Sequence, residues 1–160
     1  MVETLVRLMP ASLHRALMPL AHRLRRIWWR WHGKPIVGTA VILTNPAGEI
    51  LLLRHSYGHP VWALPGGGLG RREDPEQGAR RELREELGIR AATMRAVGVV
   101  EEQVAGIEHV GHVFAALSSE TPTPDGREVT QARFFAPDAL PKLGQLARSR
   151  LALWQETHCH

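Results

Sequence analysis

Hydrophobic and polar positions separate an amphipathic N-terminal segment from a region that alternates between strand and helix patterns. Between Leu13 and Trp31, leucines and aromatic residues recur every three or four positions, a spacing typical of one helix face. Pro19 would kink or divide that helix. From Pro35 onward, runs rich in β-branched residues predict strands, bounded by turns such as 45–48. Strands are expected at residues 36–44, 50–54, 91–103, 109–116 and 128–135.

One helix in the middle of the chain has start and stop signals at both ends. Asp74 is placed as the N-cap, Pro75 as the first helical residue and Gln77 as the capping partner. Gly88 is placed to end the helix, because glycine readily adopts the left-handed conformation after a last turn. A further helix is expected within residues 144–156. Strands around a central helix, followed by a terminal helix, predict an α+β fold.

The central helix carries three glutamates on one side, Glu82, Glu85 and Glu86. At roughly 100° per residue they share an arc about 100° wide, and Glu82 and Glu86 are like charges one turn apart. Glu86 also borders the apolar stripe that would face the core. Anions crowded beside a buried face need a counter-charge, and hard divalent cations such as Mg²⁺ prefer oxygen ligands. The alternative is a solvated helix face on which interleaved arginines balance the glutamates.

These glutamates belong to a longer pattern, which reads Gly67-x5-Glu73-x7-Arg81-Glu82-Leu83-x-Glu85-Glu86-x-Gly88-Ile89. The pattern resembles the signature of the Nudix hydrolases, with every defined position filled over about 23 residues. A looser resemblance extends over residues 35–140. It implies a mixed β-sheet sandwiched between α-helices, with residues 35–160 as the Nudix domain and residues 1–34 as a basic helical extension.

Nudix hydrolases cleave a diphosphate bond, usually in a nucleoside diphosphate linked to another group, and the resemblance implies this activity here. It implies that Glu82, Glu85 and Glu86 bind one to three Mg²⁺ ions, directly or through water, with Mn²⁺ as a substitute. A carbonyl of the glycine run, for which Gly66 is our choice, would complete the metal shell. Arg81 is expected to orient the glutamates rather than to bind the substrate.

The water that attacks phosphorus must give its proton to a base. Glu85 and Glu86 are candidates within the motif. Glu128, which precedes the last predicted strand, resembles the glutamate that some family members place six residues before an aromatic residue. Glu101 and Glu102, at the end of an earlier strand, compete for the same role, and the sequence leaves this choice open.

Four positions in or just before the motif are candidates for contact with the substrate. Gly67 allows the backbone to approach a phosphate closely, and Arg54, Tyr57 and Trp62 offer cationic or aromatic side chains. Each aromatic residue is alternatively a packing residue of the core or of a loop. The nucleotide stays undefined: some family members read an oxidised guanine with a late asparagine, whereas Asn45, the only asparagine here, lies in a predicted turn.

Charge is distributed unevenly along the 160 residues. Residues 1–34 hold seven Lys/Arg and one Glu, a net +6, whereas the remainder carries −2, which gives the overall +4. The extension therefore has three candidate roles: packing against the domain or a second copy in a homodimer, binding a membrane surface, or contacting RNA.

The remaining composition favours a cytoplasmic enzyme, which would be peripheral to a membrane if the extension binds lipid. Cys159 is the only cysteine, so no intrachain disulfide can form. No apolar run approaches the ~20 residues of a membrane span. Two other functions compete with catalysis: a Nudix-fold binding module, and a membrane- or RNA-associated protein directed by its extension. The intact glutamates argue against loss of catalysis.

Overall fold

The computed structural model describes residues 35–56, 60–104 and 106–158. The predicted extension, residues 1–34, and the predicted contact residue Tyr57 lie outside these ranges. Strands and helices follow one another in the order β1 (Ile36–Thr44), β2 (Ile50–His55), α3 (Pro75–Leu87), β3 (Met94–Val104), β4 (Ile107–Leu117), β5 (Val129–Phe135) and α4 (Gln145–His158).

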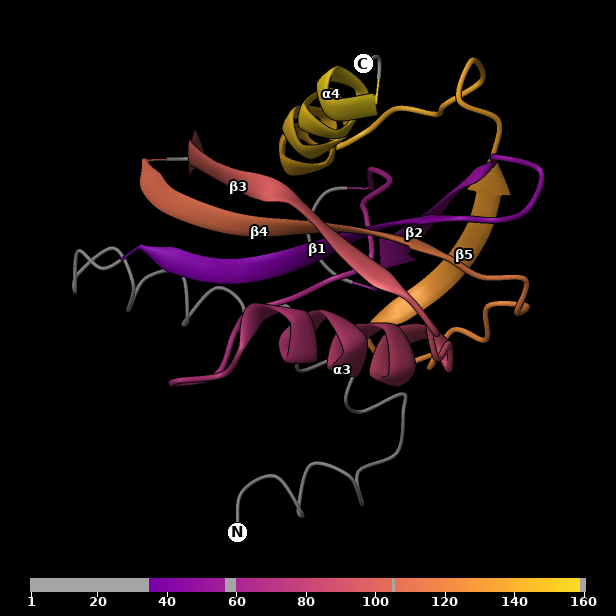
Figure 1. Ribbon diagram of the computed structural model, residues 1–160, viewed down its shortest axis with the longest axis horizontal. Helices are drawn as coiled ribbons and strands as arrows, with labels where there is room; N and C mark the ends of the chain where they lie inside the picture. Colours follow the sequence, from indigo (N-terminus) through magenta and orange to yellow (C-terminus); the bar gives the residue numbers. More distant parts are fainter. Residues whose placement is uncertain (1–34, 57–59, 105, 159–160) are drawn as a thin grey trace, which may run out of the picture.

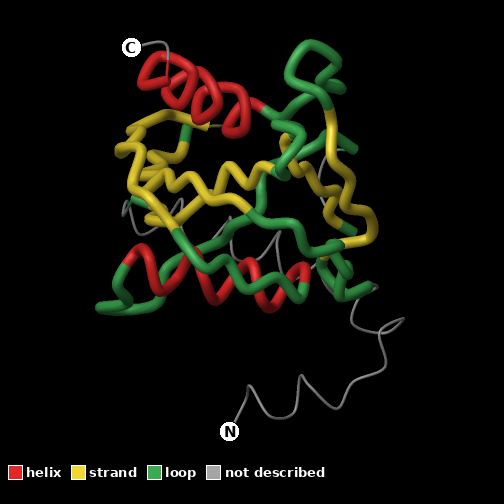
Figure 2. The backbone as a smooth tube through the Cα atoms, turned by 45° about the vertical axis from the view of Figure 1, so that its right-hand side comes forward, coloured by secondary structure: helices red, strands yellow, loops and turns green. Residues whose placement is uncertain are grey.

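The strands form one mixed sheet in the order β3-β4-β1-β2-β5. β1 and β4 run parallel, whereas the other neighbouring pairs are antiparallel. α3 covers one face and α4 the other (Figure 1), and the rotated view in Figure 2 shows the two helices on opposite sides of the strands. The predicted sandwich is therefore confirmed. Within the described ranges, neither helix has the length and apolar content needed to cross a bilayer.

Alternating apolar residues of β1 build a core on each face of the sheet. Val41 and Leu43 pack with the apolar side of α3. Ala40 and Ile42 belong to the core beneath α4. In β1 the side chains that point to either face of the sheet are apolar. Both faces of the strand are therefore buried, as expected for a strand between two helical layers.

β1 and β2 separate soon after their turn, and residues 62–68 fill the gap between them. The two strands pair at Thr44 and Ile50, beyond which the segment bridges both neighbours, Ala63 to Leu53 and Gly68 to Gly38. The Val41 N–H donates to the Pro65 carbonyl over 2.9 Å. The glycine run is therefore fixed in the plane of the sheet, where it borders α3.

The predicted ends of α3 are confirmed. The Asp74 side chain accepts a 3.0 Å hydrogen bond from the backbone N–H of Gln77, and Pro75 opens the helix. Gly88 ends it in the left-handed conformation, with φ 70°. β3 begins at Met94 and not at residue 91, because Ala91 packs in the α3 core and its carbonyl accepts from Arg80 Nη1.

Candidate active site

The three glutamates of α3 differ in their exposure. The Glu85 side chain is 47% exposed, whereas that of Glu82 is 14% exposed, and Glu86 is buried. Glu86 Oε2 accepts a 3.0 Å hydrogen bond from the Gly66 N–H. The helix therefore directs one carboxylate at the glycine run, one to its border and one toward solvent.

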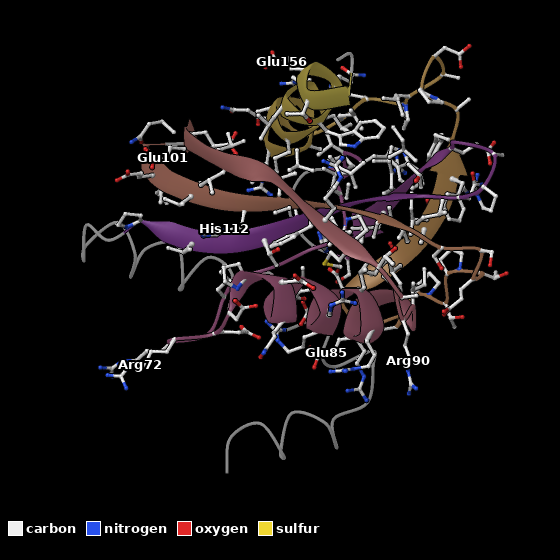
Figure 3. All side chains as sticks on the ribbon, viewed as in Figure 1. Arg72, Glu85, Arg90, Glu101, His112 and Glu156 are labelled. Carbon is white, nitrogen blue, oxygen red and sulfur yellow. The ribbon has the colours of Figure 1, made fainter. Side chains whose placement is uncertain are left out.

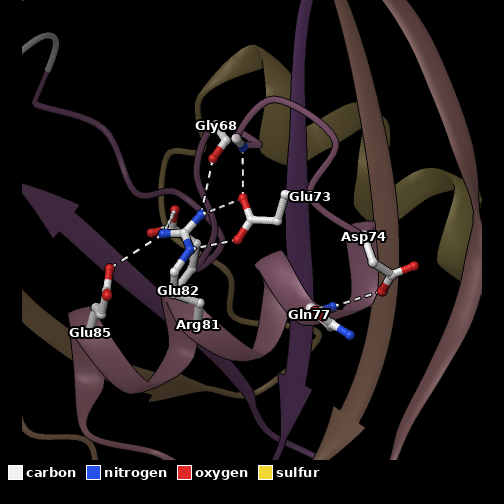
Figure 4. A network of polar contacts seen from close by, with 8 residues as sticks. Gly68, Glu73, Asp74, Gln77, Arg81, Glu82 and Glu85 are labelled. Carbon is white, nitrogen blue, oxygen red and sulfur yellow. Dashed lines mark hydrogen bonds and ion pairs between the residues drawn. The ribbon is translucent and has the colours of Figure 1, made fainter.

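Arg81 connects these glutamates to the loop before the helix (Figure 4). Its guanidinium donates two hydrogen bonds to Glu73, over 2.8 and 3.1 Å. It also donates to Glu82 over 2.8 Å and to Glu85 over 3.3 Å. A further bond of 3.2 Å reaches the Gly68 carbonyl. Arg81 thus orders three carboxylates and one loop carbonyl at once.

Glu73 accepts the two hydrogen bonds that fix the Arg81 guanidinium. Its Oε2 also accepts a 2.7 Å hydrogen bond from the Gly70 N–H. The bonds from Arg81, and then that from Gly70, lower the pKa of Glu73 to about 2. Glu73 therefore stays ionised, and its paired Arg81 stays charged.

Two glycines allow the loop to lie against α3 and β1. Gly66 has φ 142°, and a β-carbon there would collide with the Thr39 carbonyl. A β-carbon on Gly67 would lie 2.5 Å from Glu82 Oε1. The Gly67 carbonyl accepts a 2.9 Å bond from the Thr39 N–H, whereas the Gly66 carbonyl accepts no backbone hydrogen bond from the described part of the chain.

Burial and like charges act together on the carboxylates. Burial raises the pKa of Glu86 well above 4.5, against the opposing bond from Gly66. Burial also raises the pKa of Glu82, although Arg81 opposes it. The Glu128 carboxylate raises both pKa values further, and Asp125 adds to that of Glu86. One arginine therefore does not compensate this cluster, which favours an additional cation.

The donor chemistry fits a hard divalent cation, since three carboxylates and a backbone carbonyl offer only oxygen ligands. Among residues 35–56, 60–104 and 106–158, however, no three His, Cys, Asp or Glu side chains converge closely enough to hold a metal ion. Arg81 draws Glu82 and Glu85 toward itself, and Glu86 faces the Gly66 N–H. The second carboxylate oxygen of each glutamate accepts no hydrogen bond within the described residues and is available to a cation.

The candidate bases lie in different places. Glu128 lies near the end of α3, because the Asp125 N–H donates to the Glu86 carbonyl over 3.1 Å and the Asp125 side chain accepts from the Glu128 N–H. Glu102 lies on the α4 side, where Ser149 donates to it over 2.6 Å and Arg150 pairs with it at 3.6 Å. Glu101 is exposed on the outer strand β3, and Figure 3 shows it apart from Glu85 on α3.

Arg54 and Trp62 lie on the face of the sheet opposite to Glu86. Trp62 is 7% exposed in the core beneath α4 and packs edge-to-face on Phe135, with ring centroids 4.8 Å apart. The Arg54 guanidinium lies 5.0 Å from the centre of the Trp62 ring. The structure thus brings Gly66, Gly67 and the glutamates together, and it leaves this pair outside the cluster.

Asp125 was missed by the sequence interpretation. Its side chain accepts hydrogen bonds from the backbone N–H groups of Arg127, Glu128 and Val129. It therefore fixes the entry to β5 beside the carboxylates. The Pro124-Asp125-Gly126 turn was the available signal, because aspartate in such turns commonly binds nearby N–H groups.

Comparison with known proteins gives a consistent result. Residues 34–155 match the model of the NUDIX domain. An uncharacterized Nudix hydrolase of Pseudomonas aeruginosa is 35% identical over 106 residues, 63% of each chain. An RNA pyrophosphohydrolase of Cellvibrio japonicus is 45% identical over 56 residues, 35% of this chain and 32% of that protein. The chain thus matches less than two thirds of the length of either relative.

Among solved structures, a MutT NUDIX hydrolase from Burkholderia pseudomallei superposes with a TM-score of 0.69 at 30% identity. The match covers 75% of this chain and 98% of that one. The similarity therefore includes three quarters of this chain and nearly the whole of the solved structure.

Proposed function

The chain belongs to the Nudix family, and from this premise we propose that it is a Mg²⁺-dependent pyrophosphohydrolase of a nucleotide-type diphosphate, with Mn²⁺ as a substitute metal. The observation that carries the proposal is the cluster of Glu82, Glu85 and Glu86 beside the glycine run, ordered by Arg81. Such a cluster is electrostatically unfavourable without a cation, and a diphosphate substrate would add more negative charge.

In this proposal Glu82, Glu85 and Glu86 hold the cation together with the Gly66 carbonyl. When bound, the cation neutralises the phosphates and polarises a phosphoryl oxygen. Arg81 keeps Glu82 and Glu85 on one side of the helix, and Glu73 holds Arg81 in its bidentate geometry.

Glu128 is the proposed base. Water attacks phosphorus, its proton passes to the Glu128 carboxylate, and the leaving phosphate departs with the bonding electron pair. Two contacts support this role: the Asp125 N–H donates to the Glu86 carbonyl over 3.1 Å, and the Asp125 side chain accepts from the Glu128 N–H. The ion pair of Glu102 with Arg150 on the other face favours a structural role for Glu102.

The proposed substrate contacts have unequal support. Gly67 borders Glu82 and could admit a phosphate. Trp62 is buried and stacked with Arg54, which favours packing over direct contact with the substrate. Tyr57 remains a prediction from the sequence. Asn45 binds Glu49 within the β1–β2 turn, at 2.7 Å, so it is not available to read a base.

The test of this function is a substrate panel assayed with Mg²⁺, with EDTA, and with Mg²⁺ restored. The panel contains dNTPs, oxidised dGTP, ADP-ribose, dinucleoside polyphosphates, nucleotide sugars, coenzyme A, and RNA with a triphosphate or a cap. We expect one substrate class to exceed roughly 10⁴ M⁻¹s⁻¹ in kcat/KM. A silent panel from a folded protein that binds Mg²⁺ would contradict hydrolysis and favour a binding module.

The basic extension is proposed to act separately from catalysis, in a protein located in the cytoplasm. Its candidate partners, a membrane surface, RNA or a second copy of the chain, rest on the charge and pattern of residues 1–34. Removing these residues should abolish pelleting with anionic vesicles or RNA, or convert a dimer to a monomer, while turnover of soluble nucleotides persists. Loss of the folded domain would instead assign the extension a structural role.

A further inference from the structure

Thr39 carries a buried hydroxyl group with no hydrogen-bond partner in the described part of the chain. The residue is 2% exposed, and its Oγ1 lacks both donor and acceptor contacts there. Buried hydroxyls are nearly always hydrogen-bonded in native proteins, because burial without a partner costs free energy. The Thr39 hydroxyl is therefore available to donate a hydrogen bond to a polar group of the site beside it.

The backbone contacts of Thr39 place its side chain near the acidic side of α3. Thr39 precedes Ala40 in β1, so by strand alternation it shares the α3 face with Val41. Its N–H binds the Gly67 carbonyl, and its own carbonyl lies against Gly66. These contacts place the hydroxyl beside the glycine run that borders the acidic side of α3.

The glycine run also provides the contacts of the two buried glutamates. Gly66 donates its N–H to Glu86, and Gly67 lies against the Glu82 carboxyl group. Of the two, Glu86 is the more deeply buried, and Gly66 supplies its only hydrogen bond from the described residues. A carboxylate that binds a cation needs further hydrogen bonds to fix its orientation, and such supporting groups influence metal affinity.

We propose that Thr39 is a positioning residue of the metal site, whose hydroxyl donates a hydrogen bond to the Glu86 carboxylate when Glu86 binds the divalent cation. The inference rests on the proposed function, since it requires Glu86 to bind metal. It explains why a hydroxyl is present at a buried position where valine has the same shape. In the structure Glu86 faces Gly66, and the Thr39 hydroxyl has no hydrogen-bond partner in the described part of the chain.

The test is a titration with Mn²⁺ of the full-length wild type, Thr39→Val and Thr39→Ser, with free Mn²⁺ measured by electron paramagnetic resonance. Thr39→Val keeps the shape and removes the hydroxyl, and it should weaken Mn²⁺ binding by ~10-fold or more. Thr39→Ser keeps the hydroxyl and should stay within about threefold of the wild type. Thermal unfolding without metal should show Thr39→Val at least as stable as the wild type, because no hydrogen bond is lost.

Thr44→Val is the matched control on the same strand. The Thr44 hydroxyl donates to the Ala116 carbonyl at 3.4 Å, away from the glutamates, so this variant should bind Mn²⁺ like the wild type. Unchanged Mn²⁺ affinity in Thr39→Val would overturn the inference. This holds even if the KM for the substrate rises in that variant. If the wild type binds Mn²⁺ and Thr39→Val binds it equally, only this inference fails. A wild type that binds no Mn²⁺ would overturn the proposed function as well.

Discussion

The Glu86 carboxylate lies on the core side of α3, and the Gly66 N–H provides its one hydrogen bond from the described residues. Burial raises its pKa well above 4.5, so the folded, metal-free protein binds the proton more tightly than the unfolded chain does. The stabilisation by protonated Glu86 is complete below pH 4.5 and is lost as pH rises through the folded pKa. Above pH 4.5 the buried carboxyl group therefore destabilises the metal-free fold relative to a side chain that cannot ionise.

Glu86→Gln should consequently stabilise the metal-free protein at neutral pH. Glutamine keeps an oxygen for the Gly66 N–H and cannot ionise, so we expect Tm to rise by roughly 3 °C or more. The gain should shrink as pH falls toward 4.5, because the wild-type carboxyl then becomes protonated. Thermal unfolding in EDTA across this pH range measures both effects. Glu85→Gln, at an exposed position, is the control and should change Tm by about 1 °C at most. An equal rise in both variants would show that burial of the Glu86 carboxyl group is not the cause.

Arg81 and Arg80 are adjacent arginines with different partners. Arg81 donates to Glu73, Glu82 and Glu85, whereas Arg80 donates to Glu76 and to the Ala91 carbonyl, away from the three glutamates. Lysine cannot reproduce the bidentate contact. Arg81→Lys should therefore lower kcat by ~10-fold or more, while Arg80→Lys stays within about threefold of the wild type. Similar rates for both variants would show that the Arg81 network is not needed to order the glutamates.

The N-cap residue Asp74 fixes the start of α3. Asp74 accepts from the Gln77 N–H at 3.0 Å. Asp74→Ala should lower the free energy of unfolding by about 1 kcal/mol, whereas Asp74→Asn should cost a few tenths. Urea denaturation of the metal-free proteins measures this difference. Equal stability of the alanine and wild-type proteins would mean that packing alone fixes the start of the helix.

Local signals explain why the elements could be predicted. β1 was predicted with its observed bounds, and α3 with its observed caps, because β-branched runs and capping residues act within a few positions. The start of β3 was predicted three residues early, since the packing of Ala91 against α3 is a tertiary contact. Likewise, the insertion of residues 62–68 between β1 and β2 has no signal within the segment itself.

At the scale of the whole molecule, the sheet divides the candidate bases between two faces. Glu128 acts on the glutamates of α3, whereas the buried side chain of Glu102 pairs with Arg150 of α4. The sequence predicted both residues as candidate bases. It could not predict on which face of the sheet each one lies, because that depends on long-range strand register. The same applies to Trp62, which the sequence offered as either a contact or a core residue and which is buried beneath α4.

This division predicts opposite effects for two conservative substitutions. Glu128→Gln should lower kcat by ~10²-fold with little change in stability. Glu102→Gln should keep kcat near the wild-type value and lower the free energy of unfolding by about 2 kcal/mol, because Arg150 loses its buried counter-charge. Steady-state kinetics and urea denaturation of both variants test this. A large loss of kcat in Glu102→Gln alone would reverse the assignment of the base.

Hydrolysis at the acidic side of α3 should depend on a divalent metal and on Glu86. The most direct measurement compares initial rates of Mg²⁺-dependent hydrolysis for the wild type, Glu86→Gln and Glu76→Gln, using the best substrate of the panel. Glu76 lies on the same helix and pairs with Arg80 outside the cluster. We predict a loss of ~10²-fold or more for Glu86→Gln, and rates within about threefold of the wild type for Glu76→Gln. Wild-type rates from a folded Glu86→Gln protein would contradict the claim.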